Sequence, residues 1–321
     1  MVTSLSLQPS RTNLRKVNKD FSVRMLGTAS AMPVSGKYQS AQVLCVHGRY
    51  FLIDCGEGVQ QQMETLKVPM MRLDSIFISH IHGDHVFGLF GLLSTLGMKG
   101  RTAVMNIYGP ANLGPIIKFF LSYYGDGLAY ELRFFPLKGS APEVVYDTKT
   151  LEVVAVPLNH AIETYGYIFR EKRPPLNVHK WAVEAFGLSL TEIGALKRGE
   201  DVTRPDGTVL TVDRCAYLPW EPSSYAYISD TAPFPQEVPW LKGIGTLYHE
   251  TTYLSAHEDL AAQRHHSTTL QAASIALEAG AGRLIIGHYS SREKDIALYE
   301  AECRTIFPNT FAATDGSSFE I

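Results

Sequence analysis

The sequence predicts a mixed α/β fold in which helices cover one or two β-sheets. The chain has 321 residues, of which 45% are hydrophobic and 19% are charged, as is usual for a globular protein. Short runs of apolar, β-branched and aromatic residues recur along the chain and predict strands. Runs with helical spacing separate several of these strands, and this mixture favours layers of helices and sheets.

The predicted strands are residues 21–26, 41–46, 50–53, 75–79, 104–108, 132–135, 151–156, 165–169, 225–229, 246–248 and 283–286. Helices are predicted where apolar residues recur at helical spacing, over residues 57–66, 86–98, 113–124, 268–279 and 293–306. For the helix over 268–279, Ser267 is the expected N-cap and Gly280 the expected stop, because each residue type favours that position.

One long segment interrupts this pattern. Residues 171–222 are rich in Pro, Gly and charged residues, and they separate the strands predicted at 165–169 and 225–229. A connection longer than about 12–15 residues is usually functional or disordered. The simplest alternative is a surface excursion that contains one short helix, over residues 180–186.

Charge and cysteine content limit the class of protein. The net charge is −3 and the pI is about 6.4, so the chain as a whole lacks a strongly basic nucleic-acid footprint, although a local patch is compatible with these values. The four cysteines lie far apart without a C-x-x-C pair, which argues against a disulfide framework or a thiolate zinc site. This cysteine usage fits a reducing cytosol, so we expect a cytoplasmic protein.

The chain is expected to form one domain over residues 21–321, preceded by an extension over residues 1–20. This extension is polar and carries Lys and Arg without an apolar core segment, so it does not fit a secretory signal. No run approaches about 18 apolar residues, so neither a membrane span nor a membrane partner is expected.

The strongest motif lies directly after a predicted strand and holds His80, His82, Asp84 and His85 within six residues. Imidazole and carboxylate groups suit Zn²⁺, Fe or Mn²⁺. His80 and His82 alternate, so an extended backbone directs both to one side. Gly83 frees the backbone, so the next two side chains can reach a second point. Two ions about 3.5–4 Å apart are typical of enzymes that hydrolyse phosphate esters.

The remaining ligands for two ions are expected at the ends of three later strands. His160 follows the strand over 151–156, Asp230 follows 225–229, and His288 follows 283–286. Open α/β sheets usually place their sites at such strand ends. Each residue alone fits a capping role equally well, but together with the motif they complete a ligand set.

At these residues the sequence resembles the metallo-β-lactamase superfamily, which shares the pattern H-x-H-x-D-H followed by separate His, Asp and His residues. It is most similar to the ribonuclease Z (tRNase Z) branch. The similar segments are LGTASAMP at 26–33, FLIDCGEGVQQQM at 51–63, FISHIHGDHVFGLFGLL at 77–93, YAYISDT at 225–231, HETTY at 249–253, HSTTLQAA at 266–273 and LIIGHYSSR at 284–292. The long segment before Ser-Asp-Thr and the His-Ser-Thr segment narrow the resemblance to this branch.

The resemblance implies an αββα sandwich of two mixed β-sheets flanked by helices, with the site at one edge. It also implies two Zn²⁺ ions per chain, with Mn²⁺ or Fe as alternatives. Matched by position, the ligands of one ion are His80, His82 and His160, those of the other are Asp84, His85 and His288, and Asp230 bridges both. Asp54 matches a carboxylate that is not a ligand. We expect it to orient the metal loop by hydrogen bonds, and its alternative is a turn residue at a strand end.

The implied activity is removal of the 3′ trailer from precursor tRNA, which leaves a 3′-hydroxyl on the tRNA and a 5′-phosphate on the trailer. Asp84 matches the proton acceptor of the family. His266 matches the His-Ser-Thr histidine and is expected to donate a proton to the leaving oxygen or to steady its phosphate, whereas the adjacent His265 is out of phase with the motif. Glu250 would orient His266 and raise its pKa. The alternative for Glu250 is a buried, hydrogen-bonded structural carboxylate.

Residues from about 170 to 222 correspond to the arm with which the family grips tRNA. The expected phosphate contacts are Lys172, Arg173, Lys180, Lys197, Arg198 and Arg204. This chain lacks the Gly-Pro pair that many relatives carry before the basic part of the arm, which leaves the details of the grip open. Family members pair so that the arm of one subunit serves the other, so a homodimer is expected.

Two other functions remain open. The first is a phosphodiesterase or arylsulfatase-like esterase that uses the same metals on small substrates, but the arm and the His-Ser-Thr segment argue against it. The second is an RNA-binding module without catalysis. Such a protein would usually have lost metal ligands, and all seven ligand positions are occupied in this sequence.

Overall fold

The computed structural model describes residues 21–321, and the predicted extension over residues 1–20 lies outside this range. The described residues divide into two compact units. The large unit comprises residues 21–172 and 223–321, and the small unit comprises residues 173–222. None of the helices in the described part of the chain has both the length and the apolar character that a membrane span needs.

The large unit contains two mixed β-sheets of seven strands each. In spatial order, the first sheet consists of β18 (Ser318–Glu320), β1 (Phe21–Gly27), β2 (Ala41–Val46), β3 (Arg49–Ile53), β4 (Leu73–Phe77), β5 (Met105–Pro110) and β6 (Leu132–Leu137). The second consists of β17 (Thr310–Ala312), β16 (Arg283–Gly287), β15 (Thr246–Glu250), β14 (Ser224–Ile228), β9 (Tyr165–Glu171), β8 (Leu151–Pro157) and β7 (Glu143–Asp147). Each sheet has a parallel half, β3 to β6 in the first and β14 to β17 in the second.

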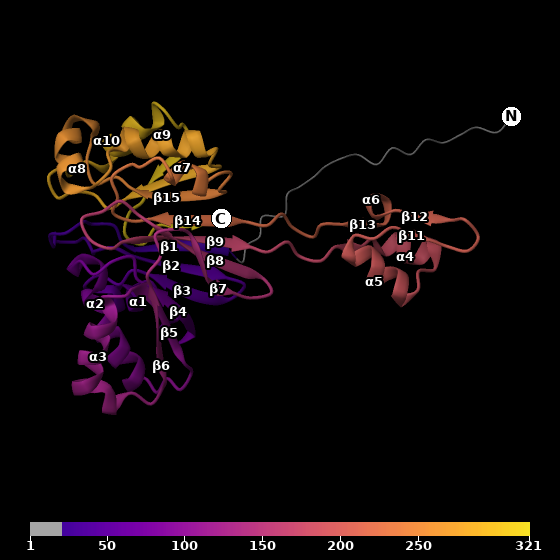
Figure 1. Cartoon of the computed structure of the whole chain (residues 1–321), viewed down its shortest axis with the longest axis horizontal. Coiled ribbons are helices and arrows are strands. Elements are labelled where there is room, and N and C mark those ends of the chain that lie inside the picture. The colour runs from indigo at the N-terminus through magenta and orange to yellow at the C-terminus, as the bar shows by residue number, and fades with distance from the viewer. Residues whose placement is uncertain (1–20) are drawn as a thin grey trace. The chain divides into compact units, whose positions relative to one another are not determined.

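Helices cover the outer face of each sheet (Figure 1). Beside the first sheet lie α1 (Val59–Thr65), η1 (Met70–Arg72), α2 (Gly83–Met98), α3 (Leu113–Tyr124) and η2 (Gly125–Gly127). Beside the second lie α7 (Glu237–Trp240), η3 (Ser255–His257), α8 (Glu258–Arg264), α9 (Thr269–Ala279) and α10 (Ile296–Arg304). The predicted αββα sandwich is therefore confirmed.

The two sheets face each other across an aromatic core. Phe51, Phe77, Tyr167 and Phe169 are fully buried there, and their rings meet at centroid distances between 5.1 and 6.3 Å. Phe77 at the end of β4 faces this core, whereas its neighbour Ile76 packs under the helices of the first sheet. Adjacent residues of a strand point to opposite faces, so the apolar run Ile76–Ile78 is buried on both faces of the sheet.

The structure corrects several expected elements. β7, β17, β18, α7 and α8 were not expected, because β7 is an exposed edge strand, β17 and β18 have three residues each, and the two helices are short. The expected N-cap of α9 is wrong. Thr268 caps α9 through a reciprocal pair of contacts with Gln271, whereas the Ser267 hydroxyl donates instead to the backbone oxygen of Thr231, at 2.7 Å.

The small unit has its own core and contains three helices where a surface excursion would have one. Its elements are β10 (Asn177–Val178) paired with β13 (Ala216–Tyr217), β11 (Val202–Thr203) paired with β12 (Val209–Leu210), and helices α4 (Lys180–Phe186), α5 (Leu190–Arg198) and α6 (Val212–Cys215). The buried residues of this core are Ala182, Leu188, Leu196, Leu210 and Cys215. The segment is therefore a packed unit and not an irregular loop.

Candidate metal centre

The expected metal ligands gather at the carboxyl ends of strands from both sheets. His80 and His82 follow β4, His160 follows β8, Asp230 follows β14, and His288 follows β16. The parallel strands β14, β15 and β16 end at a common edge, because their registers align Ile228 with His249 and Glu250 with Gly287. Strand order thus brings together residues that lie more than 200 positions apart in the sequence.

The first group of ligands contains His80, His82, His160 and Asp230, whose nearest nitrogen and oxygen atoms lie within 4.8 Å of one another. Nδ1 of His82 lies 3.0 Å from Nε2 of His80 and 3.4 Å from Nε2 of His160. Two ligands of a tetrahedral zinc ion, each about 2.0–2.1 Å from the metal, lie about 3.3 Å apart. The three imidazoles therefore have the spacing that a shared cation requires.

The second group contains Asp84, His85 and His288. Nε2 of His85 lies 3.2 Å from Nε2 of His288, and Oδ2 of Asp84 lies 3.5 Å from both nitrogens. Asp84 and His85 belong to the first turn of α2, because the helix begins at Gly83 and not after the motif as expected. The change of direction between His82 and Asp84 is thus made by the start of a helix.

Asp230 lies between the two groups. Its Oδ2 faces Nε2 of His80 at 3.5 Å and Nε2 of His160 at 3.9 Å, while its Oδ1 faces Nε2 of His288 at 3.3 Å and Nε2 of His85 at 3.6 Å. Oδ1 is buried and makes no hydrogen bond to another described residue. A buried carboxylate oxygen without a hydrogen bond is costly. A cation held between the groups would satisfy it, so the residues present fit a divalent metal.

The second nitrogen of four of these imidazoles is held by a hydrogen-bonding partner, as is usual for metal-binding histidines. The contacts are His80 Nδ1 with Ser79 Oγ at 2.9 Å, His85 Nδ1 with Asp54 Oδ2 at 2.8 Å, His160 Nδ1 with the His265 backbone oxygen at 2.9 Å, and His288 Nδ1 with Thr252 Oγ1 at 2.8 Å. These partners orient the rings and leave each Nε2 directed towards the centre.

Asp54 makes the hydrogen bonds to the loop after β4 that were expected of it. Its side chain is fully buried and accepts hydrogen bonds from the backbone N–H of Ser79 at 2.7 Å, the Ser79 hydroxyl at 2.8 Å and the Tyr227 hydroxyl at 2.6 Å, in addition to the contact with His85. Its φ of 54° lies in the left-handed region, which Asp tolerates better than most residues. The carboxylate thus connects β4, α2 and β14 beneath the ligands.

The protonation of the centre favours cation binding. Burial lowers the pKa of His80, His82 and His160, so these imidazoles are neutral near pH 7 and have a lone pair available. Burial alone would also lower the pKa of His85, but the surrounding carboxylates outweigh burial and raise it well above its ordinary value. This concentration of negative charge is what a bound cation would neutralise.

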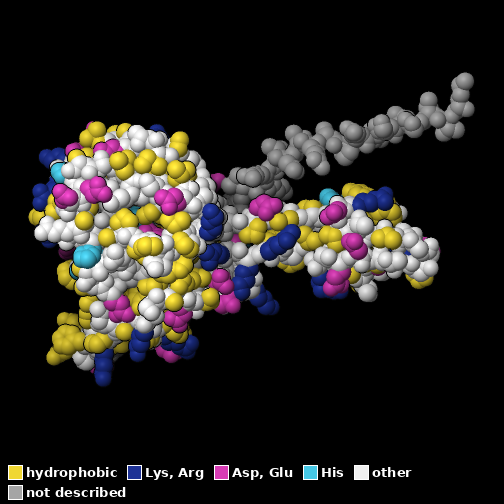
Figure 2. All heavy atoms as spheres, turned by 45° about the horizontal axis from the view of Figure 1, so that its top comes forward, with side chains coloured by type: hydrophobic (Ala, Val, Ile, Leu, Met, Phe, Trp, Pro, Cys, Tyr) yellow, Lys and Arg dark blue, Asp and Glu magenta, His cyan; other side chains and the backbone are white. Residues whose placement is uncertain are grey.

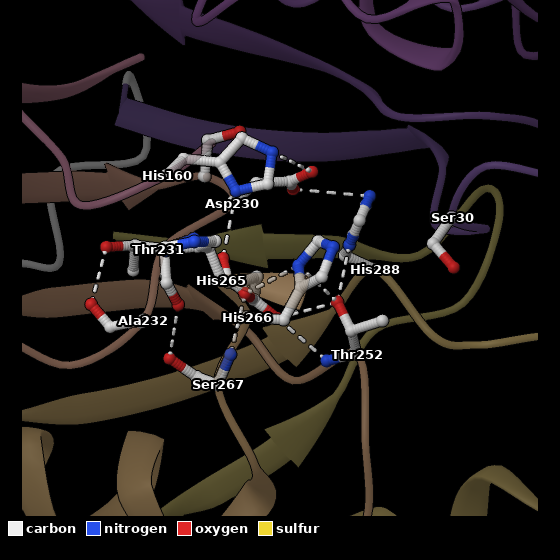
Figure 3. Close-up of polar contacts among 12 residues, drawn as sticks. Ser30, His160, Asp230, Thr231, Ala232, Thr252, His265, His266, Ser267 and His288 are labelled. Carbon is white, nitrogen blue, oxygen red and sulfur yellow. Dashed lines mark hydrogen bonds and ion pairs between the residues drawn. The ribbon is translucent and has the colours of Figure 1, made fainter. Parts of the chain in front are cut away.

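His266 lies beside the ligands and contacts a buried carboxylate. Its Nδ1 is 3.0 Å from Oε1 of Glu250, and its ring centroid is 5.2 Å from that of His160. The Thr252 hydroxyl lies 3.2 Å from Nδ1 of His266 and 2.8 Å from Nδ1 of His288 and donates to Glu250 at 2.7 Å (Figure 3). One threonine therefore links the expected catalytic pair to a metal ligand.

The ligands open into a cavity of about 1010 Å³. Residues from both groups line it, together with His266, and further out Phe87, Arg264 and Arg292 contribute to its walls. The adjacent His265 is exposed, and its backbone oxygen rather than its ring takes part in the centre. The cavity is large enough for nucleotide-sized groups to reach the ligands.

Of the six residues expected to contact phosphate, five lie in the small unit, whereas Lys172 lies in the large unit and forms an ion pair with Asp147. Residues 173–222 hold six Lys or Arg and seven Asp or Glu, so this unit is not basic overall. Arg204 forms a two-pronged ion pair with Glu192 at 2.6 and 3.1 Å, and Arg198 forms one with Glu200 at 2.8 and 2.9 Å. Among the described residues, Lys197 has no ion-pair partner.

Sequence reasoning did not assign several residues that the structure brings into the site. Thr252 stands in the segment HETTY and Ser79 directly precedes His80, yet neither position signals a contact with an imidazole. The backbone N–H of Ala31 donates to Oδ2 of Asp84 at 2.6 Å. In the sequence, the only sign that such residues belong to the site was their proximity to a motif. Each of these contacts depends on how loops from distant parts of the chain meet.

Comparisons with known proteins agree with this architecture. Residues 21–122 match the family model described as "Anti-Pycsar protein Apyc1", which covers less than half of the chain. A protein named Ribonuclease Z from Cytophaga hutchinsonii is 43% identical over 303 residues, which are 94% of this chain and 96% of that protein. Human tRNase Z, short form, is 25% identical with a TM-score of 0.66, covering 93% of this chain and 98% of that one. The metallo-beta-lactamase fold protein YhfI from Bacillus subtilis shares the fold at 17% identity, with a TM-score of 0.67 and coverage of 93% and 98%.

Proposed function

The chain belongs to the ribonuclease Z family, and from this premise we propose that it is a metal-dependent endoribonuclease that removes the 3′ trailer from tRNA precursors. The products are a 3′-hydroxyl on the tRNA and a 5′-phosphate on the trailer. The observation that carries the proposal is the pair of ligand groups that share Asp230 and open into a cavity of about 1010 Å³.

Two Zn²⁺ ions are proposed, one held by His80, His82 and His160 and the other by Asp84, His85 and His288, with Asp230 shared. Bound divalent ions lower the pKa of water and offset charge on a phosphodiester. The alternation of imidazoles and carboxylates at ligand spacing supports this assignment. Asp84 is proposed as the proton acceptor, because its carboxylate borders the cavity and is held by the Ala31 N–H and His288.

His266 is proposed to supply the proton that the leaving 3′ oxygen needs. Burial alone would lower the pKa of His266, but the charges of Glu250 and Asp230 outweigh burial and raise it to about 9. The ring is therefore protonated near pH 7 and reaches the cavity. Glu250 acts through His266 as a positioning residue, since it is fully buried and does not line the cavity.

The small unit is proposed to bind the body of the tRNA. Lys197 and Arg198 end α5, and Lys197 has no ion-pair partner among the described residues, so its charge is available for a phosphate. Arg204 is proposed to contribute mainly by holding α5 to the loop after β11, because its donors are used by Glu192 and the Phe186 backbone oxygen. Arg198 is also paired, with Glu200, but its side chain is 62% exposed against 25% for Arg204, so Arg198 remains accessible to RNA and Arg204 takes a structural part.

A homodimer is also proposed, with the exposed face of α3 as its surface. Ile116, Phe119 and Tyr123 lie on one side of α3 at helical spacing, and they are 37%, 65% and 71% exposed. Figure 2 shows hydrophobic side chains gathered at the end of the large unit where α3 lies. Light scattering of wild type and Phe119→Glu tests this: we expect a dimer that the charge disrupts, and a wild-type monomer would contradict it.

A cytoplasmic location is proposed as well, supported by four free cysteines.

The function is tested by incubating the protein with a tRNA precursor and mapping the new ends. We expect one cut at the trailer junction, with a 3′-hydroxyl and a 5′-phosphate, and loss of cutting when a chelator is added. A chromogenic phosphodiester serves as the comparison substrate. Cleavage of that diester without cleavage of the precursor would favour the alternative, a phosphodiesterase or arylsulfatase-like esterase for small substrates.

A further inference from the structure

Phe87 is an exposed aromatic residue on the wall of the catalytic cavity. Its side chain is 68% exposed, and among the described residues no other aromatic ring packs against it. Single exposed apolar residues are common on protein surfaces and by themselves need no explanation. Phe87 differs in its position, because it borders the cavity that holds the metal ligands.

The start of α2 determines this position. Phe87 follows Asp84 by three residues and Gly83 by four, so all three lie on the same side of the helix. A Cβ atom at position 83 would lie 2.3 to 2.8 Å from ring carbons of Phe87. The ring therefore rests directly on the backbone of Gly83, next to the ligand His82. A larger residue at position 83 would force the ring away from this place.

Another part of the same cavity is positively charged, in contrast to the apolar ring of Phe87. Arg264 and Arg292 also line it, and among the described residues neither has an ion-pair partner. Met32, which is 66% exposed, adds to the apolar part of the lining with Phe87. The cavity thus offers both an apolar aromatic surface and free positive charge, which are the two features that single-stranded nucleic acids bind.

We propose that Phe87 is a stacking platform for the base of one nucleotide next to the scissile phosphate. This inference rests on the proposed function, because it requires single-stranded RNA at the metal centre. Unpaired RNA bases stack on aromatic side chains, and stacking tolerates any base because each has a flat π-face. Asp84 lies one turn of α2 from Phe87 and also borders the cavity. A base stacked on Phe87 would therefore hold the adjoining phosphate near Asp84.

The first experiment measures RNA binding without cleavage. All variants are made in a His266→Ala background, with metal content checked, and bind a fluorescent tRNA precursor carrying a short trailer. Three precursors are compared: one intact, one lacking the base of the last retained nucleotide, and one lacking the base of the first trailer nucleotide. We expect Phe87→Ala to weaken binding of the intact precursor about tenfold, and Phe87→Trp to restore it, since stacking on an aromatic ring has this size.

The decisive result is the coupling between protein and RNA. If Phe87 stacks on one base, Phe87→Ala will weaken binding of the intact precursor but not of the one precursor that lacks that base. Phe311→Ala is the control, because Phe311 is 38% exposed on β17 and does not line the cavity. Equal weakening of all three precursors, or none, would overturn the stacking role.

Two further outcomes are distinguishable. If Phe87→Ala lowers the molecular mass in light scattering, the ring belongs to a contact between copies, and the proposal is overturned. If the protein with an intact His266 binds the precursor but releases no trailer, the proposed function fails. The binding experiment still decides the role of Phe87 in that case, because it does not depend on cleavage.

Discussion

Nδ1 of His266 lies 3.0 Å from Oε1 of Glu250, in a pair whose carboxylate is fully buried and whose imidazole is 14% exposed. The same carboxylate accepts hydrogen bonds from the backbone N–H groups of Ser267 at 2.8 Å and Thr252 at 2.8 Å. The carboxylate is thus held rigidly, and the histidine it faces is the group that reaches the cavity. This arrangement leads to separate predictions for the two residues.

Replacing His266 should stop the chemistry without removing the metals. His266→Gln is expected to lower kcat by about 10²–10⁴, the usual contribution of a positioned proton donor. Metal content by elemental analysis and precursor affinity should stay at wild-type values, because His266 is not needed to complete either ligand group. Cleavage by His266→Gln at the wild-type rate would exclude the proposed role.

Replacing Glu250 should move the pH dependence. The Glu250 charge raises the pKa of His266, so activity that needs protonated His266 falls as pH rises through this pKa. Glu250→Gln removes the charge, which lowers the pKa of His266 and moves the alkaline limb of the rate profile to lower pH. The measurement is kcat against pH for both proteins, with Glu237→Gln as the control in a second buried pair, that of Glu237 with His249. An unchanged alkaline limb would contradict this reading.

Metal removal should inactivate and destabilise the protein together. We expect two ions per chain in protein purified without chelator, and His82→Ala should lose metal and activity in parallel. A ligand that binds only the folded state at a hundred times its Kd stabilises by about 2.7 kcal/mol. Chelation should therefore lower the melting temperature in calorimetry, and added Zn²⁺ should restore it. One ion per chain, or none, would exclude the two-metal centre.

Asp54→Asn should weaken metal binding while preserving the fold. Asn tolerates the left-handed backbone at φ 54°, so the substitution adds little strain. The carboxamide cannot replace all four contacts to Ser79, His85 and Tyr227. Loss of such a supporting contact typically lowers metal affinity about 10–100-fold. Metal titration by calorimetry checks this, and unchanged affinity would mean that the ligands are oriented without Asp54.

The small unit should affect RNA binding and not the chemical step. The double variant Lys197→Ala, Arg198→Ala is expected to weaken precursor binding. The slope of log affinity against log salt concentration should fall by about one unit for each lost phosphate contact. Hydrolysis of a small chromogenic diester should stay unchanged. Arg204→Ala is the matched comparison, because it breaks the pair with Glu192 and should loosen the unit, seen as faster hydrogen exchange in α5. Equal loss on both substrates would contradict a role confined to binding.

The order and type of most elements, and the seven His and Asp residues that meet at the centre, could be predicted from the sequence. Strand and helix periods are local properties, so the runs now seen as β1, β2 and β8 were predicted within one residue at each end. The dense His80 to His85 motif likewise indicated a metal centre, because four ligand groups within six residues have little other use.

Which distant groups meet depends on how the elements pack. Glu250 reaches His266, and Thr252 reaches His288, because β15 and β16 lie side by side in register and the loop before α9 returns to their ends. The same packing pairs Arg204 with Glu192 and leaves Phe87 exposed on the cavity wall. Such contacts depend on strand order and on the approach of loops, which no local period encodes. Local sequence patterns therefore specify the kinds of groups at the site, and the packing of the two sheets selects their partners.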